Sequence, residues 1–262
     1  MFGLRSVLVG SLMTLTALAR QLDAATVVLN PSQDNTIFSA TTTNSNGQGD
    51  LYVGLTNSGN IRRALLQFDI FGAIPAGATI TEVSLTLREQ SGNNGNRQVD
   101  LLRVTNAWGE GASLSSGTGA GNGAAAQTGD ATWTSRIFNT QAWTNPGGDF
   151  SSTVSGSTLV TAGTTNQQFT WSSTASGNGQ LLLDVQNWLT NPGQNFGWLL
   201  RGDESANQTA KVFYSGESAV PANLPALTIT FTPATVPEPS VVGAIVAAGG
   251  LGIATILRRR RV

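Results

Sequence analysis

An alternation of apolar and polar residues with a period of two is the sequence feature that most constrains the fold. The segment 82–88 reads E-V-S-L-T-L-R, and the segment 227–232 reads L-T-I-T-F-T. Because successive side chains of a strand point to opposite faces, each segment predicts a strand with one buried and one exposed face. Further strands are expected over short apolar runs at 26–29, 51–53, 64–70, 99–104, 168–171, 197–201 and 212–214.

Turn-forming residues separate these runs. The chain has 31 glycines and only 11% charged residues, a composition that disfavours long helices with many ion pairs. The pattern predicts an all-β fold, an antiparallel β-sandwich of the jelly-roll type. One short helix is expected over 184–189, since Val185, Trp188 and Leu189 have helical spacing and Asn191-Pro192-Gly193 ends it. Trp188 is then expected in the core.

The 262 residues divide into three parts. Residues 1–24 have the pattern of a signal peptide, and residues 236–262 have that of a membrane-associated tail, so each end is expected to contain a helix. Residues 25–235 contain no proline-rich or charge-rich linker, so we expect them to form one domain. A chain of that length can bury a core large enough to be stable alone.

The chain contains neither cysteine nor histidine. This excludes thiol nucleophiles, imidazole bases, Cys/His zinc sites and the Ser-His-Asp triad. The remaining enzymatic option is a carboxylate pair of the glycosidase kind. The adjacent acids Asp203 and Glu204 are better explained by a solvated turn after a strand. We therefore predict no catalytic residues and no enzymatic activity.

The charge of the middle part disfavours nucleic acid as a partner. Eight of the 14 basic residues and 13 of the 15 acidic residues lie between the two ends, so this part carries a net charge of −5. Binding to nucleic acid needs a basic surface. An acidic polysaccharide is not attracted at long range either, and would need a local cluster around Arg62, Arg63, Arg136 or Lys211, or a bridging calcium ion.

The N-terminal segment has the three regions of a secretory signal. Arg5 precedes an apolar run from Ser6 to Ala19, and small residues follow it. Cleavage is expected after Ala19 or Ala24. The alternative is a core element of the mature fold, but the polar run that starts at Ser32 indicates that the domain begins just before it.

The C-terminal segment combines three features in a fixed order. An uncharged run, Val241–Leu257, is near the lower length limit for a membrane-spanning helix. The motif before it is Val236, Pro237, Glu238 and Pro239, and the charges after it are Arg258, Arg259, Arg260 and Arg261. The arginines should stay cytoplasmic, which places the domain on the other side of the inner membrane.

This order resembles the PEP-CTERM sorting signal of bacteria that make extracellular polysaccharide. The resemblance implies that an exosortase-type membrane protease cuts near Pro237–Pro239. The protein would then be held only transiently in the inner membrane before it joins the cell envelope or the extracellular matrix. The alternative is an ordinary single-span anchor with a proline-stiffened stalk.

The middle part carries several short motifs in the order seen in one known family. They are G-D-L-Y-V-G at 49–54, R-A-L-L-Q-F-D at 63–69, W-G-E-G at 108–111, A-T-W at 131–133 and P-A-L at 225–227. In this order they resemble the disaggregatase-related (DNRLRE) domain. That family is similar to carbohydrate-binding modules, so the resemblance implies a polysaccharide ligand.

Tryptophans are the residues with which a sugar-binding site could be built. An exposed indole face stacks well on the apolar face of a sugar ring. Trp143 lies beside the polar run T-N-P-G-G and is the first candidate, and Trp108 beside G-E-G is the second. Trp133, in contrast, lies in a strand-like run and is expected to pack inside.

Two further features concern loops. Asp34 and Asp50 lie in turn-like segments and are the candidates for calcium ligands, with turn capping as the alternative. No cofactor is otherwise expected. The run 111–129 is rich in glycine, serine and alanine, so it offers little apolar surface to bury. It is expected to be a mobile surface loop.

These inferences lead to one functional expectation. The chain is predicted to be an exported, non-enzymatic protein of the cell surface or the extracellular matrix that binds polysaccharide. Two alternatives remain open, namely a purely structural envelope protein and a polysaccharide hydrolase or lyase.

Overall fold

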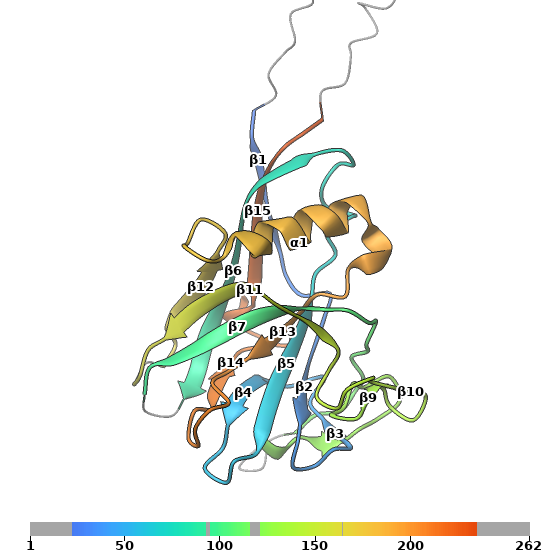
Figure 1. The fold of residues 1–262 in the computed structure, drawn as a ribbon, viewed down its shortest axis with the longest axis vertical. Helices are drawn as coiled ribbons and strands as arrows, with labels where there is room; N and C mark the ends of the chain where they lie inside the picture. Colours follow the sequence, from blue (N-terminus) through green and yellow to red (C-terminus); the bar gives the residue numbers. More distant parts are fainter. Residues whose placement is uncertain (1–22, 93–94, 116–120, 164, 235–262) are drawn as a thin grey trace, which may run out of the picture. The chain divides into compact units, whose positions relative to one another are not determined.

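The structure is a computed structural model that describes residues 23–92, 95–115, 121–163 and 165–234 (Figure 1). These residues form strands and one α-helix, α1 (Gly179–Thr190). The strands are β1 (Ala25–Leu29), β2 (Gln33–Phe38), β3 (Asn44–Ser45), β4 (Leu51–Leu55), β5 (Ile61–Gln67), β6 (Thr79–Gly92), β7 (Arg97–Val104), β8 (Ala124–Ala125), β9 (Ser135–Ile137), β10 (Gln141–Ala142), β11 (Phe150–Val160), β12 (Gln168–Ser172), β13 (Trp198–Arg201), β14 (Lys211–Phe213) and β15 (Ala226–Thr232).

The strands pair in antiparallel fashion and form a β-sandwich. One layer has the order β1-β15-β6-β12, and the other contains β2, β5, β13, β7 and β11. Strand β14 joins the layers, because it pairs with β6 on one side and with β4 on the other, and β4 pairs with β5. The predicted all-β, antiparallel architecture with one helix is confirmed.

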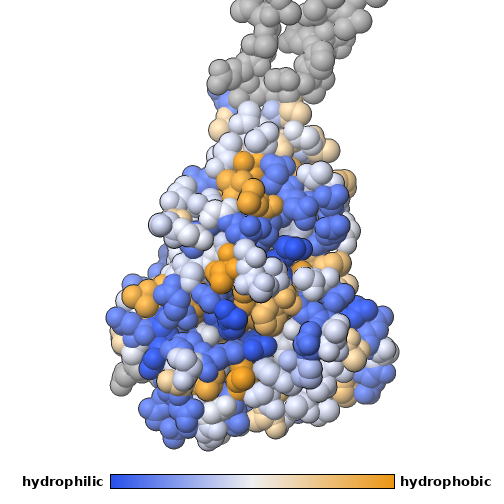
Figure 2. Space-filling model, viewed as in Figure 1, coloured by the Kyte–Doolittle hydropathy of each residue, from blue (hydrophilic) through white to orange (hydrophobic). Residues whose placement is uncertain are grey.

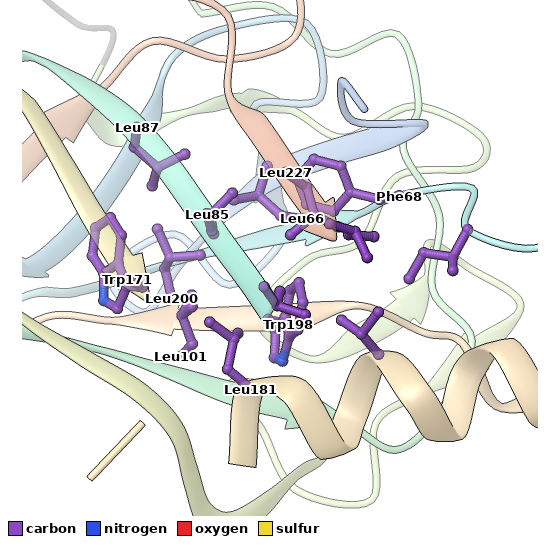
Figure 3. Packing of buried hydrophobic residues seen from close by; sticks show 14 of the residues in the cluster. Leu66, Phe68, Leu85, Leu87, Leu101, Trp171, Leu181, Trp198, Leu200 and Leu227 are labelled. Atoms are coloured by element: carbon purple, nitrogen blue, oxygen red, sulfur yellow. The ribbon is translucent and has the colours of Figure 1, made fainter. Parts of the chain in front are cut away.

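The main core lies between the two layers. Leu85 and Leu87 of β6 and Leu227 of β15 contribute from the first layer, and Leu66 and Trp198 contribute from the second (Figure 3). All of these side chains are buried completely. The period-two alternation of β6 and β15 therefore has the predicted cause, since one face of each strand packs here and the other faces outward.

The second layer is buried on both of its faces. Leu65 of β5 and Leu199 of β13 point away from the main core into a smaller cluster, to which Trp108, Ala131 and Trp143 also belong. This explains why β5 and β13 contain the continuous apolar runs A-L-L and W-L-L rather than an alternation.

Helix α1 is longer than predicted. It has 12 residues and begins at Gly179 rather than at 184. Asn178 precedes the helix and is of a residue type that often caps helices, but its side chain accepts a hydrogen bond from the backbone N–H of Ser157 and does not cap α1. Tertiary packing of α1 against β6 and β11 sets its start. Trp188 is 1% exposed, as predicted for a core residue, and its ring lies 4.5 Å from that of Trp198.

The low-complexity run 111–129 is not the free loop that its composition predicts, as far as it is described. Ser113 is buried, and its hydroxyl donates to Asp130 Oδ1 (2.9 Å). The backbone N–H of Ser115 donates to Asn46 Oδ1 (2.9 Å), and β8 pairs with β3. Hydrogen bonds hold this segment where apolar burial cannot, so the expectation of a mobile loop was wrong for these residues.

Both ends of the chain lie outside the described residues. These residues include most of the segment predicted to be a signal peptide, up to residue 22, together with the Val236–Pro239 motif, the apolar run Val241–Leu257 and Arg258–Arg261. Within the described ranges, no helix is both long and apolar enough to cross a membrane.

Candidate functional site

A pocket of about 440 Å³ opens where β4, β5, β6 and β14 meet. Its lining residues come from four strands and from the turn between β4 and β5, and most are polar. They are Tyr52, Thr56, Asn57, Arg62, Ser91, Ala210 and Val212. The face of the domain in Figure 2 is mostly hydrophilic, with small separate hydrophobic patches.

Tyr52 and Arg62 form the centre of this pocket. Strand pairing places Tyr52 of β4 opposite Val212 of β14 and brings Arg62 of β5 opposite Gly54 of β4. The Arg62 guanidinium lies 5.8 Å from the centre of the Tyr52 ring, close enough for a cation–π contact. Its Nη2 donates to Asn122 Oδ1 (3.3 Å).

Gly54 shapes the wall beside these residues. Its φ of +92° is a conformation that side chains rarely adopt, and a Cβ there would lie 2.8 Å from the carbonyl oxygen of Thr209. The close approach lets the Thr209 hydroxyl accept a hydrogen bond from the N–H of Leu55 (2.8 Å). Glycine at this position therefore allows the close packing of β4, the strand that contains Tyr52, against Thr209.

Amides and hydroxyls surround the aromatic ring. Gln208 Nε2 donates to Asn57 Oδ1 (2.8 Å) at the exposed rim. Gln90 Nε2 donates to Asp50 Oδ2 (2.8 Å) nearby. Burial, and to a smaller extent the charge of Asp50, raises the pKa of Tyr52. Its phenol therefore remains a hydrogen-bond donor at neutral pH.

The two tryptophans predicted to present an open indole face do not do so. Trp143 is 5% exposed and Trp108 is 4% exposed. Their indole N–H groups donate to the carbonyl oxygens of Thr132 and Phe196, each at 2.8 Å. The polar residues after Trp143 misled the prediction, because Asp149 accepts hydrogen bonds from their backbone and folds them over the ring.

Trp133 was expected to pack inside but is only partly buried. The guanidinium of Arg63 lies 5.0 Å from the centre of its ring and also donates to both carboxylate oxygens of Glu204 at 2.8 Å. Asp203 accepts from Arg97 at 2.9 Å. The pair Asp203 and Glu204 is thus engaged in ion pairs rather than free in a solvated turn.

The four basic residues considered for an acidic ligand are not brought together. Lys211 is 1% exposed and pairs with Glu89 at 3.1 Å, while Arg63 is held by Glu204. Arg136 donates to the carbonyl oxygen of Ala107. Arg62 alone among these four lines the pocket.

The calcium candidates lie in different surroundings. Asp50 is partly buried beside Gln90, and burial raises its pKa despite that hydrogen bond. Asp34 is 1% exposed, and its backbone N–H donates to Glu110 Oε2 (2.9 Å). Across the described part of the chain, no group of three or more Asp or Glu side chains is arranged to hold a metal ion.

Comparison with known protein families gives a match over residues 25–183 to carbohydrate-binding module family 96. This range is more than half of the chain. The chain belongs to this family. Five of the pocket residues lie inside the range of the family 96 module, whereas Ala210 and Val212 come from beyond it. A search among curated proteins found no match.

Sequence reasoning did not find this pocket. Its residues are far apart in the chain, and only the pairing of β4 with β5 and β14 collects them. A partial signal existed, because Tyr52 and Arg63 belong to motifs that were quoted for the family resemblance. Arg62, next to the second motif, was named only as one of four possible cations.

Proposed function

We propose that this family 96 module binds a polysaccharide in the pocket formed around Tyr52 and Arg62. The observation that carries the proposal is the convergence of an aromatic ring, a guanidinium, the Asn57 amide and two hydroxyls in one open pocket of a carbohydrate-binding module. Sites for small polar ligands combine an apolar surface with a few polar groups that fix the orientation of the ligand.

Each lining group has a role that its chemistry defines. Tyr52 is 9% exposed, so only a small part of its ring can pack against sugar C–H groups, and its hydroxyl donates a hydrogen bond. Arg62 donates in a fork geometry to vicinal hydroxyls or to a sugar carboxylate. The amide of Asn57, which accepts a hydrogen bond from Gln208, donates to the ligand. A net charge of −5 on residues 25–235 opposes an acidic glycan at long range, so uronate binding would depend on Arg62.

Glycan-array binding of the full chain tests the proposal, with neutral and uronate-containing polysaccharides on the same array. We expect retention by at least one class, and competition by soluble oligosaccharides of that class. A purely structural envelope protein would bind neither class. A hydrolase or lyase would shorten the retained glycan, which a reducing-end or unsaturated-product assay detects.

We further propose that the chain is exported and is sorted by an exosortase-type protease. The support is the order of the signal-like N-terminus, the Val236–Pro239 motif, the apolar run and the arginine cluster. In this account the module acts without catalysis at the cell surface or in the extracellular matrix. The resemblance to the DNRLRE domain agrees with that role, and a single-span anchor remains the alternative for the C-terminus.

A further inference from the structure

Asp34 has an unusual environment for an acidic residue. It lies in β2 with 1% of its surface exposed. Its Oδ2 accepts a hydrogen bond from the backbone N–H of Gly216 (2.8 Å). Within the described residues, no N–H or O–H donor reaches its Oδ1, which is fully buried. The Asp34 side chain also forms a side-chain hydrogen bond with the carboxyl of Glu217.

The charged groups around Asp34 are all acidic. Glu217, from the loop after β14, and Glu110, from the segment after β7, both act on its charge. Glu110 in turn lies near Glu217 and Asp130 and accepts a hydrogen bond from neutral Gln48. Burial, followed by the charges of Glu217 and Asp130, raises the pKa of Glu110 to about 7. Within the described residues, the charges that act on Asp34 and Glu110 are those of other acids.

A hydrogen bond between two carboxyl groups requires a proton on one of them. Two ionised carboxylates in contact repel each other, and a buried ionised carboxylate without a donor is costly. One shared proton removes both the repulsion and the cost of burying an ionised carboxylate, as in other close carboxyl pairs. Burial, and then the charge of Glu217, raises the pKa of Asp34 well above its usual value of 3.8. Asp34 is therefore the residue that carries the proton and donates it to Glu217.

We propose that Asp34 and Glu217 share one proton, and that this proton latches the loop Ser215–Val220 onto β2. The latch is closed at acidic pH and opens as the pH rises. Gly216 supports it through the second oxygen of Asp34, and Glu217, which is exposed, gives the proton a route to solvent. The inference is independent of any ligand in the pocket.

The direction of the pH effect follows from the raised pKa. The unfolded chain releases the Asp34 proton near pH 4, whereas the folded domain keeps it to higher pH. The stabilisation is therefore complete below about pH 4 and is lost as the pH rises through the folded pKa. Burial also raises the pKa of Glu110, from its usual 4.5 to about 7, so its contribution to stability is likewise lost as the pH rises through about 7.

Thermal unfolding of the full chain between pH 4.5 and pH 9, followed by tryptophan fluorescence, tests the latch. All six tryptophans lie in the described domain, so the signal reports on it. We expect the melting temperature of the wild type to fall by about 5 °C between pH 5 and pH 8. Asp34→Asn, whose amide supplies the donor at every pH, should remove at least half of this fall. Glu110→Gln should remove much of the rest.

Glu217→Gln provides the same test at an exposed position, where loss of the fold is not a concern. The matched control is Glu82→Gln, an exposed acid on β6, which should keep the wild-type slope. The latch is refuted if the wild-type melting temperature is flat or rises over this range, or if both Asp34→Asn and Glu217→Gln keep the wild-type slope. Millimolar calcium that restores the wild type but not Asp34→Asn at pH 8 would also overturn it, in favour of a bound cation.

Discussion

Lys211 and Glu89 illustrate at the residue scale how this domain buries charge. Each side chain is 1% exposed, and their charged atoms are 3.1 Å apart. Lys211 Nζ also donates to the carbonyl oxygen of Thr161 (3.0 Å). Such a pair adds little net stability, but removing one partner leaves the other charge buried.

The pair leads to a stability prediction. Lys211→Met should lower the free energy of unfolding by about 3 to 5 kcal/mol, because Glu89 loses its counter-charge. The double variant Lys211→Met/Glu89→Met should recover much of that loss. Urea unfolding followed by tryptophan fluorescence measures both. A double variant that is less stable than the single one would show that the two residues do not act as a pair.

Trp143 and Trp133 give the second residue-scale prediction. Trp143→Ala empties a buried site and should cost about 3 to 5 kcal/mol. Trp133→Ala should cost clearly less, since its ring is partly exposed and packs beside Arg63. Equal losses in the two variants would contradict the burial that distinguishes them.

At the scale of elements, one-sided strands could be predicted and buried polar strands could not. The alternation of apolar and polar residues in β6 and β15 arises because each strand buries one face, so this pattern predicted both strands. Strand β2 reads Q-D-N-T-I-F, which suggests a turn, yet five of its residues are buried. Asn35 is satisfied there because its Oδ1 accepts from the Ser45 hydroxyl (2.7 Å) and the Asn46 N–H (3.1 Å). These partners are distant enough that local patterns do not reveal them.

The segment 111–129 gives an element-scale prediction. Ser113→Ala should cost about 1 to 3 kcal/mol, because it leaves the N–H of Gly47 without its buried partner and removes one of the two hydrogen bonds to Asp130 Oδ1, the other coming from the N–H of Gly111. The matched control is Leu114→Ala at the next residue, which is 57% exposed and should cost little. Chemical denaturation compares the two. A neutral Ser113→Ala would contradict this role of the Ser113 hydroxyl and favour the mobile loop that the composition predicted.

At the scale of the whole molecule, the composition and the two ends suggest a class of protein, whereas the site can be found only from the fold. The absence of cysteine and histidine excludes thiol and imidazole catalysis and Cys/His zinc sites. The net charge of −5 on residues 25–235 disfavours nucleic acid as a partner. The pocket could not be derived in this way, since it needs the register that sets Tyr52 opposite Val212. The sequence predicts a sugar-binding site at Trp143 and Trp108 because indole rings stack well on sugars, but both side chains pack in a core cluster.

The sorting proposal is also tested on the whole chain. Replacing Pro237-Glu238-Pro239 with three alanines should leave export intact, since export depends on Ser6–Ala19. Processing should stop, and the protein should accumulate in the membrane fraction with its tail attached. Mass spectrometry of the mature C-terminus in a host with the sorting protease decides the question. An intact Val262 on the wild-type protein would favour the plain anchor.

Calorimetric titration of the glycan retained on the array tests the central claim, polysaccharide binding in the pocket, most directly. The comparison uses the wild type, Arg62→Ala in the pocket, and Arg136→Ala outside it as the matched control. Loss of a charged hydrogen-bonding group costs about 1.5 to 3 kcal/mol, so Arg62→Ala should raise Kd at least about tenfold. Arg136→Ala should keep the wild-type Kd. Equal affinities for all three proteins would contradict the placement of the site in this pocket.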